Sequence, residues 1–265
     1  MNTLDGNCSL PTLSALVSSS LHLLIPAPPP PMSDKPVVRT IVCLANSRKQ
    51  SGRCVAGKIH EQGVAPTWLR PVSSAPDQEI SEVHRRYKNG QTAQLLDVVS
   101  IPITAPTPKT YQQENHLIND GYYWSTSGRA NRALLTRLLD QDVEALWING
   151  NNTFHGENDR IALKEANSLV SSLAFIWVEK MRLRSLAESA AFGNNKRKVR
   201  AFFQWRGIDY ALVVTDPFIE AQVLAKPDGW HDLEDAFMCI SLGVPHNGAV
   251  YKLVASIITP ERMIS

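Results

Sequence analysis

Polar side chains gather in the stretch LANSRKQSGRCVAGK, residues 44–58, between two short apolar runs. They are Asn46, Ser47, Arg48, Lys49 and Arg53. Arginine offers a planar fork of donors, lysine a point charge and a tight turn its backbone N–H groups, so such a loop can hold a phosphate. Arg39, Lys58 and Arg70 on adjoining segments would extend this basic face. An ordinary solvated hairpin tip has the same composition, and both interpretations stay open.

A second basic cluster lies beside aromatic residues in the second half of the chain. Its cations are Lys196, Arg197, Lys198 and Arg200. Proteins that bind single strands place cations along the phosphate backbone and stack bases on aromatic rings. Phe203, Trp205 and Tyr210 share one alternating face and are expected in the core, which leaves Phe202 as the ring able to stack a base. The cluster therefore predicts backbone contacts and gives only weak support for base stacking.

Three residues are candidates for acid–base chemistry. Glu114 and His116 stand two residues apart after a proline-rich connection and can act together if they line a cleft. A structural role, as a polar loop tip or a helix cap, explains the pair more simply and is favoured. Asp216 precedes Pro217 and is expected to cap a helix, since Asp accepts N-terminal N–H groups and Pro suits the first turn. A glycosylase-type carboxylate is the alternative for Asp216.

Missing motifs argue against several classes of protein. The sequence contains no G-x-x-x-x-G-K-[ST], no G-x-G-x-x-G after a strand and no G-x-S-x-G, which disfavours an ATPase, a Rossmann enzyme and an α/β-hydrolase. The four cysteines form no C-x-x-C pair and the seven histidines no H-E-x-x-H, so no zinc site and no other cofactor is expected. Cys43, Cys54 and Cys239 lie in apolar runs and are expected to be reduced thiols.

Composition indicates a globular protein in one large or two small domains, with 265 residues, 43% of them hydrophobic and 20% charged. A net charge of +2 is too small to indicate nucleic acid without local clusters. Residues 1–32 contain an apolar stretch, Ala15–Ile25, that is shorter than a membrane span and follows no cationic segment. We expect a disordered leader or a true start at Met32, no membrane association and a cytoplasmic location.

The elements that must position the polar residues of the first half are short strands. Strands are expected at Val37–Ala45, Arg53–Ile59, Thr67–Val72 and Asp97–Ile103. A brief helix is expected at Ser81–Lys88. Several short strands with one brief helix predict a small barrel over residues 33–110.

The middle of the chain predicts a helical connector over residues 111–170. Its clearest part is Gly128–Trp147, where apolar residues recur at i, i+3 and i+4. Its expected role is to pack between two β units.

The second half predicts another barrel, over residues 171–265. Strands are expected at Leu173–Leu186, Ala236–Leu242 and Val250–Thr259. Lys198–Asp216 alternates as a hairpin whose two-residue loop, Arg206-Gly207, suits a primed turn. Phe218–Leu233 is expected to be helical, with a break near Pro227. Three strands, a helix and two strands is the order of an OB barrel.

Seven separated segments also resemble a known family. They are VVRTIVCLANSRKQSGRCVAGK, TWLRPVS, QLLDVVSIPI, ENHLI, KRKVRAFFQWRGIDYALVVTDP, FMCISLG and VYKLVASII. In this order, between Val37 and Thr259, they resemble the bacterial dual OB-containing domain proteins. The resemblance implies two OB-like barrels in one unit, associated with nucleic-acid processing and anti-phage defence. Val244–Asn247 departs from it, because a more acidic loop is expected there.

Residues and resemblance together predict a mainly β (α+β) protein with two OB-like β-barrels joined by a helical segment. It is expected to bind DNA or RNA through the phosphate backbone, with little readout of base sequence. One alternative is an enzyme that acts on a modified base or nucleotide in the groove between the barrels, through Glu114, His116 or Asp216. Another is an interaction module with a protein partner. The oligomeric state is left open.

Overall fold

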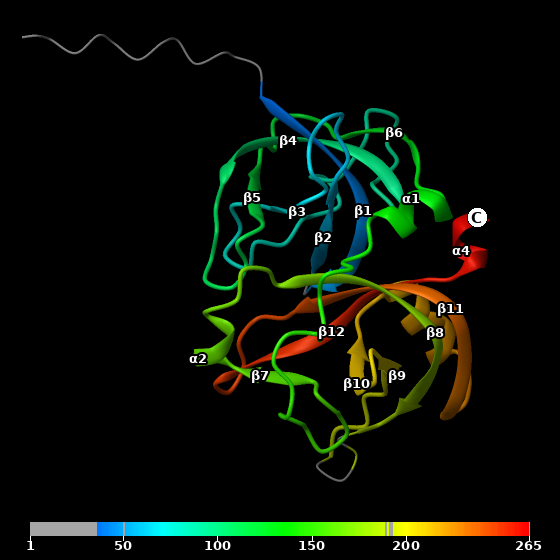
Figure 1. Ribbon diagram of the computed structural model, residues 1–265. Coiled ribbons are helices and arrows are strands. Elements are labelled where there is room, and N and C mark those ends of the chain that lie inside the picture. Colours follow the sequence, from blue (N-terminus) through cyan, green and yellow to red (C-terminus); the bar gives the residue numbers. More distant parts are fainter. Residues whose placement is uncertain (1–35, 50, 189, 191–192, 265) are drawn as a thin grey trace, which may run out of the picture. The chain divides into compact units, whose positions relative to one another are not determined.

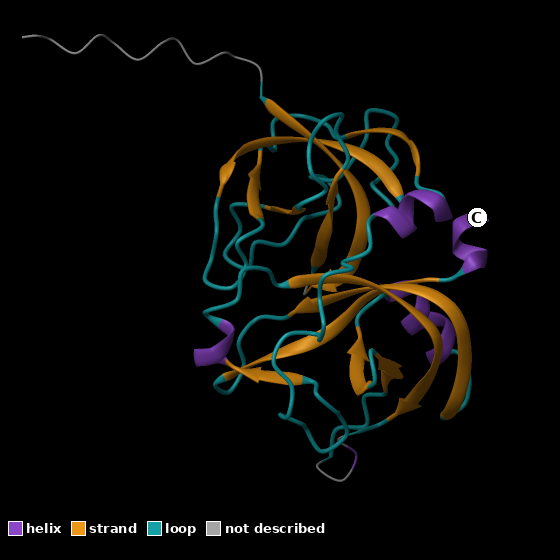
Figure 2. Ribbon diagram, viewed as in Figure 1, coloured by secondary structure: helices purple, strands orange, loops and turns teal. Residues whose placement is uncertain are grey.

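Strands dominate the computed structural model, which describes residues 36–49, 51–188, 190 and 193–264 (Figures 1 and 2). They form two six-stranded sheets, one from each half of the chain. The predicted mainly β fold is confirmed. The expected leader and Met32 lie outside the described residues.

The first sheet closes into an OB-type barrel. Its strands are β1 (Val37–Lys49), β2 (Gly52–Ile59), β3 (Trp68–Val72), β4 (Asp97–Pro106), β5 (Asn115–Ile118) and β6 (Ser125–Arg129). β1 pairs with both β2 and β4, and a parallel pairing of β3 with β5 completes the ring. β6 adds to the other edge of β4. Ile41, Leu69, Ile101 and Trp124 fill the interior.

The second sheet has the same pattern. Its strands are β7 (Arg160–Ala162), β8 (Leu173–Leu186), β9 (Lys198–Trp205), β10 (Ile208–Val214), β11 (Gly229–Leu242) and β12 (Ala249–Ile258). β8 pairs with β9 and β11, and a parallel pairing of β10 with β12 closes this barrel. Helix α3 (Pro217–Leu224) comes between the third and fourth barrel strands, as in the OB order.

The hairpin of β9 and β10 follows its sequence pattern. Arg206 and Gly207 have φ values of 49° and 76°, as a primed two-residue turn requires. The alternating apolar residues point into the barrel, where the rings of Phe203 and Tyr210 stack with centroids 5.4 Å apart. Phe202 faces outward, as predicted.

The two barrels share an apolar interface and belong to one compact unit. Leu44 and Ala56 of the first barrel join Phe175 and Phe237 of the second in a single buried cluster. The two phenylalanine rings stack with centroids 5.8 Å apart. Apolar side chains from both barrels thus fill one continuous layer.

The predicted helix Gly128–Trp147 is wrong in extent. The observed helix is α1 (Arg132–Arg137), capped by the Asn131 side chain. The chain turns away at Asp140, whose carboxylate accepts hydrogen bonds from Lys58 Nζ at 2.5 Å and from the Phe175 backbone N at 2.7 Å. The apolar pattern is still satisfied, because Leu135 and Leu138 pack in the interface between the barrels.

The expected helical connector, 111–170, also differs from the structure. It contains β5 and β6 of the first sheet and β7 of the second, besides α1 and α2 (Leu163–Ala166). The strands of the first sheet thus extend past residue 110 to Arg129. β5, β6 and β7 have only three to five residues, and β3 and β12, which pair with β5 and β7, are distant in sequence.

Two further helices differ from expectation. Ser81–Lys88 forms turns with isolated bridges in place of a helix. α3 ends at Leu224, and β11 begins at Gly229 because the following residues pair with β8, Trp230 opposite Arg184. The last helix is α4 (Pro260–Ile264). No helix within the described ranges is long and apolar enough to cross a membrane.

Candidate nucleic-acid interface

The hairpin of β1 and β2 carries the first predicted cluster and contacts the second barrel. The Arg48 backbone N donates to the Thr215 carbonyl at 3.1 Å, and its guanidinium pairs with Glu220 of α3 at 2.8 Å. Ser47 is buried. Arg48 thus serves the contact between the barrels. Lys49 is half-buried, and burial lowers the pKa of its amine.

Arg53, opposite Arg48 in the hairpin, has a different environment. Its backbone exchanges two hydrogen bonds of 2.9 Å with Ile80, which fixes the base of the side chain. Its guanidinium has no hydrogen bond or ion pair with any residue that the structure describes. The hairpin therefore offers one half-buried arginine whose donors the protein does not use.

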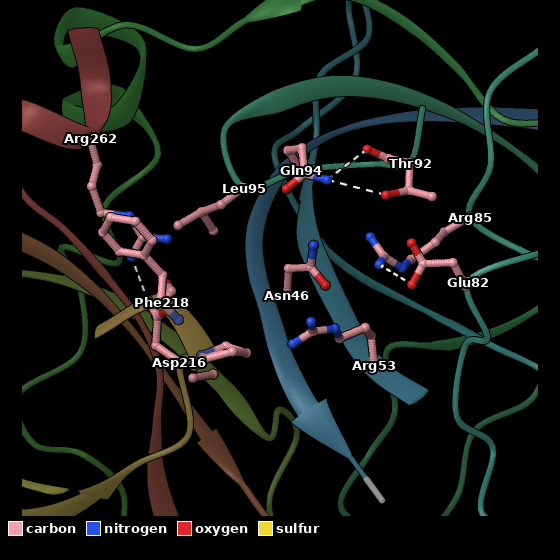
Figure 3. A pocket seen from close by; sticks show the side chains of 13 residues that line it. Asn46, Arg53, Glu82, Arg85, Thr92, Gln94, Leu95, Asp216, Phe218 and Arg262 are labelled. Carbon is pink, nitrogen blue, oxygen red and sulfur yellow. Dashed lines mark hydrogen bonds and ion pairs between the residues drawn. The ribbon is translucent and has the colours of Figure 1, made fainter. Parts of the chain in front are cut away.

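Arg53 lines a pocket of about 400 Å³ between the two barrels (Figure 3). From the first barrel come Asn46, Arg53, Glu82, Arg85, Gln94 and Leu95. From the second come Asp216, Phe218 and Arg262. Figure 3 shows Phe218 and Arg262 at one end, Arg85 and Glu82 at the other, and Asn46 and Arg53 between them.

The pocket has a surplus of positive charge. Arg85 pairs with Glu82 at 3.0 Å, and Arg262 pairs with Asp216 at 2.5 Å, so these charges are balanced. The charge of Arg53 is not balanced by an ion pair within the described residues. Burial lowers the pKa of the Arg53 guanidinium, and repulsion from Arg85 lowers that pKa further. Arginine still stays protonated in proteins, so the pocket offers a charged donor fork to an anion.

Two polar atoms in the pocket wall add unused hydrogen-bonding capacity. The Asn46 side-chain N and Arg85 Nη1 both donate to the Ala93 carbonyl, at 3.0 and 2.9 Å. Asn46 Oδ1 and Arg85 Nε are buried and have no hydrogen-bond partner among the described residues. Buried polar atoms are usually paired, so these two atoms give the pocket one spare acceptor and one spare donor.

Asp216 has the capping role that was favoured for it. Its carboxylate accepts from the backbone N of Phe218 at 3.1 Å, from the backbone N of Ile257 at 3.0 Å and from Arg262. This prediction is confirmed. The side chain is buried, and its hydrogen bonds join α3, β12 and α4.

Glu114 and Arg70 form a buried pair away from the pocket. Arg70 is 3% exposed and lies 3.1 Å from the Glu114 carboxylate, which also accepts from Ser172 Oγ. Arg70 therefore does not extend an exposed basic face, because its charge is neutralised inside the protein. His116 Nδ1 lies 2.9 Å from the Glu114 carbonyl oxygen and does not contact the Glu114 carboxylate.

The second basic cluster is also partly engaged within the protein. Arg197 pairs with Asp228 at 2.5 Å and donates to the carbonyls of Leu224 and Lys226. Arg200 is buried between Asp159 and Glu188, at 3.2 and 2.7 Å. Lys196 is exposed and Lys198 half-exposed, without an ion pair in the described part of the chain.

Phe202 is packed by neighbours that the sequence does not place beside it. The ring of Trp230 meets it edge-on with centroids 4.8 Å apart, and the Arg184 guanidinium lies 5.0 Å from its centroid. The ring stays half-buried and lines a second pocket together with Trp230 and Arg182.

Sequence reasoning missed Arg85, Phe218 and Arg262 as site residues. They come from a turn region, the first turn of α3 and α4, and no common spacing links them. The one available signal was the Asp-Pro cap, which places Phe218 at an exposed helix start. Three or more His, Cys, Asp or Glu side chains nowhere gather as metal ligands within the described residues.

Fold and site define a class of protein: two OB barrels fused through a shared core, with a positively charged pocket between them. The family model of the dual OB-containing domain matches residues 39–257, so the chain belongs to this family. A comparison with curated proteins finds no match.

Proposed function

We propose that the protein binds nucleic acid and holds a backbone phosphate at Arg53, in the pocket between the barrels. The observation that carries the proposal is the Arg53 guanidinium, which is half-buried and has no partner among the described residues. A half-buried guanidinium with unused donors is suited to bind an anion, because forked N–H donors match phosphate oxygens.

The location within the fold supports the same function. OB barrels bind oligonucleotides with the loop between their first two strands, and Arg53 follows that loop in the first barrel. Lys49 in the hairpin and Lys196 and Lys198 on the second barrel are the remaining predicted cations without an ion pair in the described chain. We propose that they add weaker phosphate contacts, so that binding depends on the backbone more than on base sequence. A role in DNA processing or anti-phage defence stays a prediction from the family resemblance.

The test is fluorescence anisotropy with labelled single strands of about twelve nucleotides, the length that OB barrels cover. Wild type and Arg53→Met are compared over a series of salt concentrations. Loss of one phosphate contact should weaken binding and reduce the slope of log K against log salt by about 0.7. Arg137→Met removes an equal charge from the exposed end of α1 and should leave affinity and slope unchanged.

Two results would contradict the proposal. One is a wild-type protein that binds no strand even at low salt. The other is an Arg53→Met protein with the affinity and salt slope of the wild type. No observation favours a catalytic role for Glu114 or Asp216, because both carboxylates are engaged in buried structural contacts.

A further inference from the structure

We infer that the pocket between the barrels accepts one unpaired nucleotide of the bound strand, with its base against Phe218 and its phosphate at Arg53. This inference rests on the proposed function and narrows the ligand to single-stranded nucleic acid. It makes Phe218 a binding residue, although its sequence position indicates only the start of a helix.

The pocket has the size and chemical asymmetry of a single nucleotide. Its volume of about 400 Å³ lies at the low end of the range for small-ligand pockets. The Phe218 ring stands at one end, and the Arg53 guanidinium lies between this ring and the Arg85 and Glu82 side chains at the other end (Figure 3). A base that is still paired within a duplex cannot enter such a pocket, so the nucleotide must be unpaired.

Phe218 is exposed in a way that suits stacking. Its side chain is 49% exposed and lines the pocket. The guanidinium of Arg262 lies over the ring, 4.7 Å from its centroid. One face of the ring is thus supported by a cation, and a base can stack on the ring from the pocket.

One buried carboxylate anchors both the backbone of Phe218 and the guanidinium over its ring. Asp216 accepts from the Phe218 backbone N and from the Arg262 guanidinium, so a single buried carboxylate positions both parts of the stack. Asp216 is therefore a positioning residue. Aromatic side chains have only two rotatable torsions, so ordering the ring on binding costs little entropy.

Opposite the ring, the first barrel supplies polar groups suited to a phosphate and a sugar. Arg53 offers its guanidinium, and the side-chain amides of Asn46 and Gln94 line the same wall. Gln94 is fixed by two hydrogen bonds from its amide N to Thr92, at 2.9 and 3.2 Å. The pocket thus combines an aromatic surface with anion and amide contacts, the set that a nucleotide requires.

The experiment compares two strands of equal length and equal phosphate number, each about twelve units long. One is oligothymidylate, and the other carries abasic sites throughout. Wild type should bind oligothymidylate at least about 5-fold more tightly than the abasic strand, the smallest effect expected for one stacked base. It should also prefer oligothymidylate over a duplex of the same length.

Variants assign the effect to the ring. Phe218→Ala and Phe218→Leu should both lose the preference for oligothymidylate, since leucine keeps apolar volume without an aromatic face. Phe218→Trp should keep it. Phe154→Ala removes a ring that is 96% exposed and outside the pocket, and should leave the preference unchanged. Thermal unfolding of each variant confirms that it is folded before binding is compared.

The outcomes separate this inference from the proposed function. Equal binding of both strands by the wild type, a preference retained in Phe218→Ala, or equal binding of the duplex would overturn the nucleotide pocket. In those cases, weaker binding of both strands by Arg53→Met would still support the phosphate contact. If the wild type binds neither strand at low salt, the proposed function itself is overturned.

Discussion

Arg48 and Arg53 stand opposite each other on one hairpin, and their surroundings give them different roles. Arg48 pairs with Glu220 of the second barrel, whereas Arg53 has no hydrogen bond or ion pair of its guanidinium within the described residues and is repelled by Arg85. Arg70 and Arg200 are neutralised by buried carboxylates. A single arginine or lysine therefore indicates a binding site only when its ion-pair partners in the fold are known.

Lys252 of β12 is a buried cation whose effect on stability can be measured. It is fully buried and has no ion pair in the described chain. Its Nζ donates to the Ile148 carbonyl at 2.8 Å and to Asn149 Oδ1 at 2.7 Å. Burial lowers the pKa of the Lys252 amine to about 7, although Asp159 opposes this shift. The folded protein then binds fewer protons than the unfolded chain between about pH 7 and 10.5.

Deprotonation of Lys252 with rising pH favours the folded state. Between these pH values, the free energy of unfolding should rise with pH more steeply in the wild type than in Lys252→Met, by up to about 1.4 kcal/mol per pH unit. The contribution is complete above the unfolded pKa and is lost as the pH falls towards 7. Urea unfolding of both proteins at several pH values measures it, and parallel profiles would show that Lys252 stays charged in the fold.

Among the elements, the pairing of β1 with β2 sets the position of Asn46 and Arg53. β1 has an irregularity between Cys43 and Ala45, and Gly57 of β2 lies opposite it. A Cβ atom at Gly57 would lie 2.0 Å from the Val42 carbonyl oxygen, so only glycine allows the two strands this approach.

Gly57→Ala should therefore destabilise the protein by about 1–3 kcal/mol or prevent folding, since backbone must move to admit the methyl group. Urea unfolding gives the value. Gly121→Ala is the matched control, because its Cβ would meet only Asn119 Oδ1 at 3.4 Å, an ordinary contact. Equal stability of the two variants would mean that β1 and β2 are packed less closely at this point.

For the whole molecule, the shared core predicts that the two barrels unfold together. Phe175→Ala removes a ring that is fully buried between them and should cost about 3–5 kcal/mol. Hydrogen exchange measured by mass spectrometry should show loss of protection in both barrels. Phe154→Ala, at an exposed ring, should change neither. Loss of protection confined to the second barrel would show that the barrels are independent folding units.

Local sequence patterns were sufficient to predict many of the strands and turns of this fold. β8 runs over Leu173–Leu186 as predicted, and the β9–β10 hairpin has the expected turn and inner face. These elements were readable because alternation of apolar residues and turn chemistry are properties of neighbouring residues. The OB order of the second barrel followed from them.

Long-range contacts decided the remainder. The helix predicted to begin at Gly128 is short because Asp140 bonds to Lys58 and β8, and β5 and β6 exist because they pair with β3 and β4. The pocket brings Arg53, Arg85, Phe218 and Arg262 together from two barrels. Residue types and spacing specified strands, turns and caps, since those depend on a few adjacent residues. Whether a cationic side chain is paired within the protein depends on carboxylates and rings far away in the chain. Only folding brings these groups close to the cation.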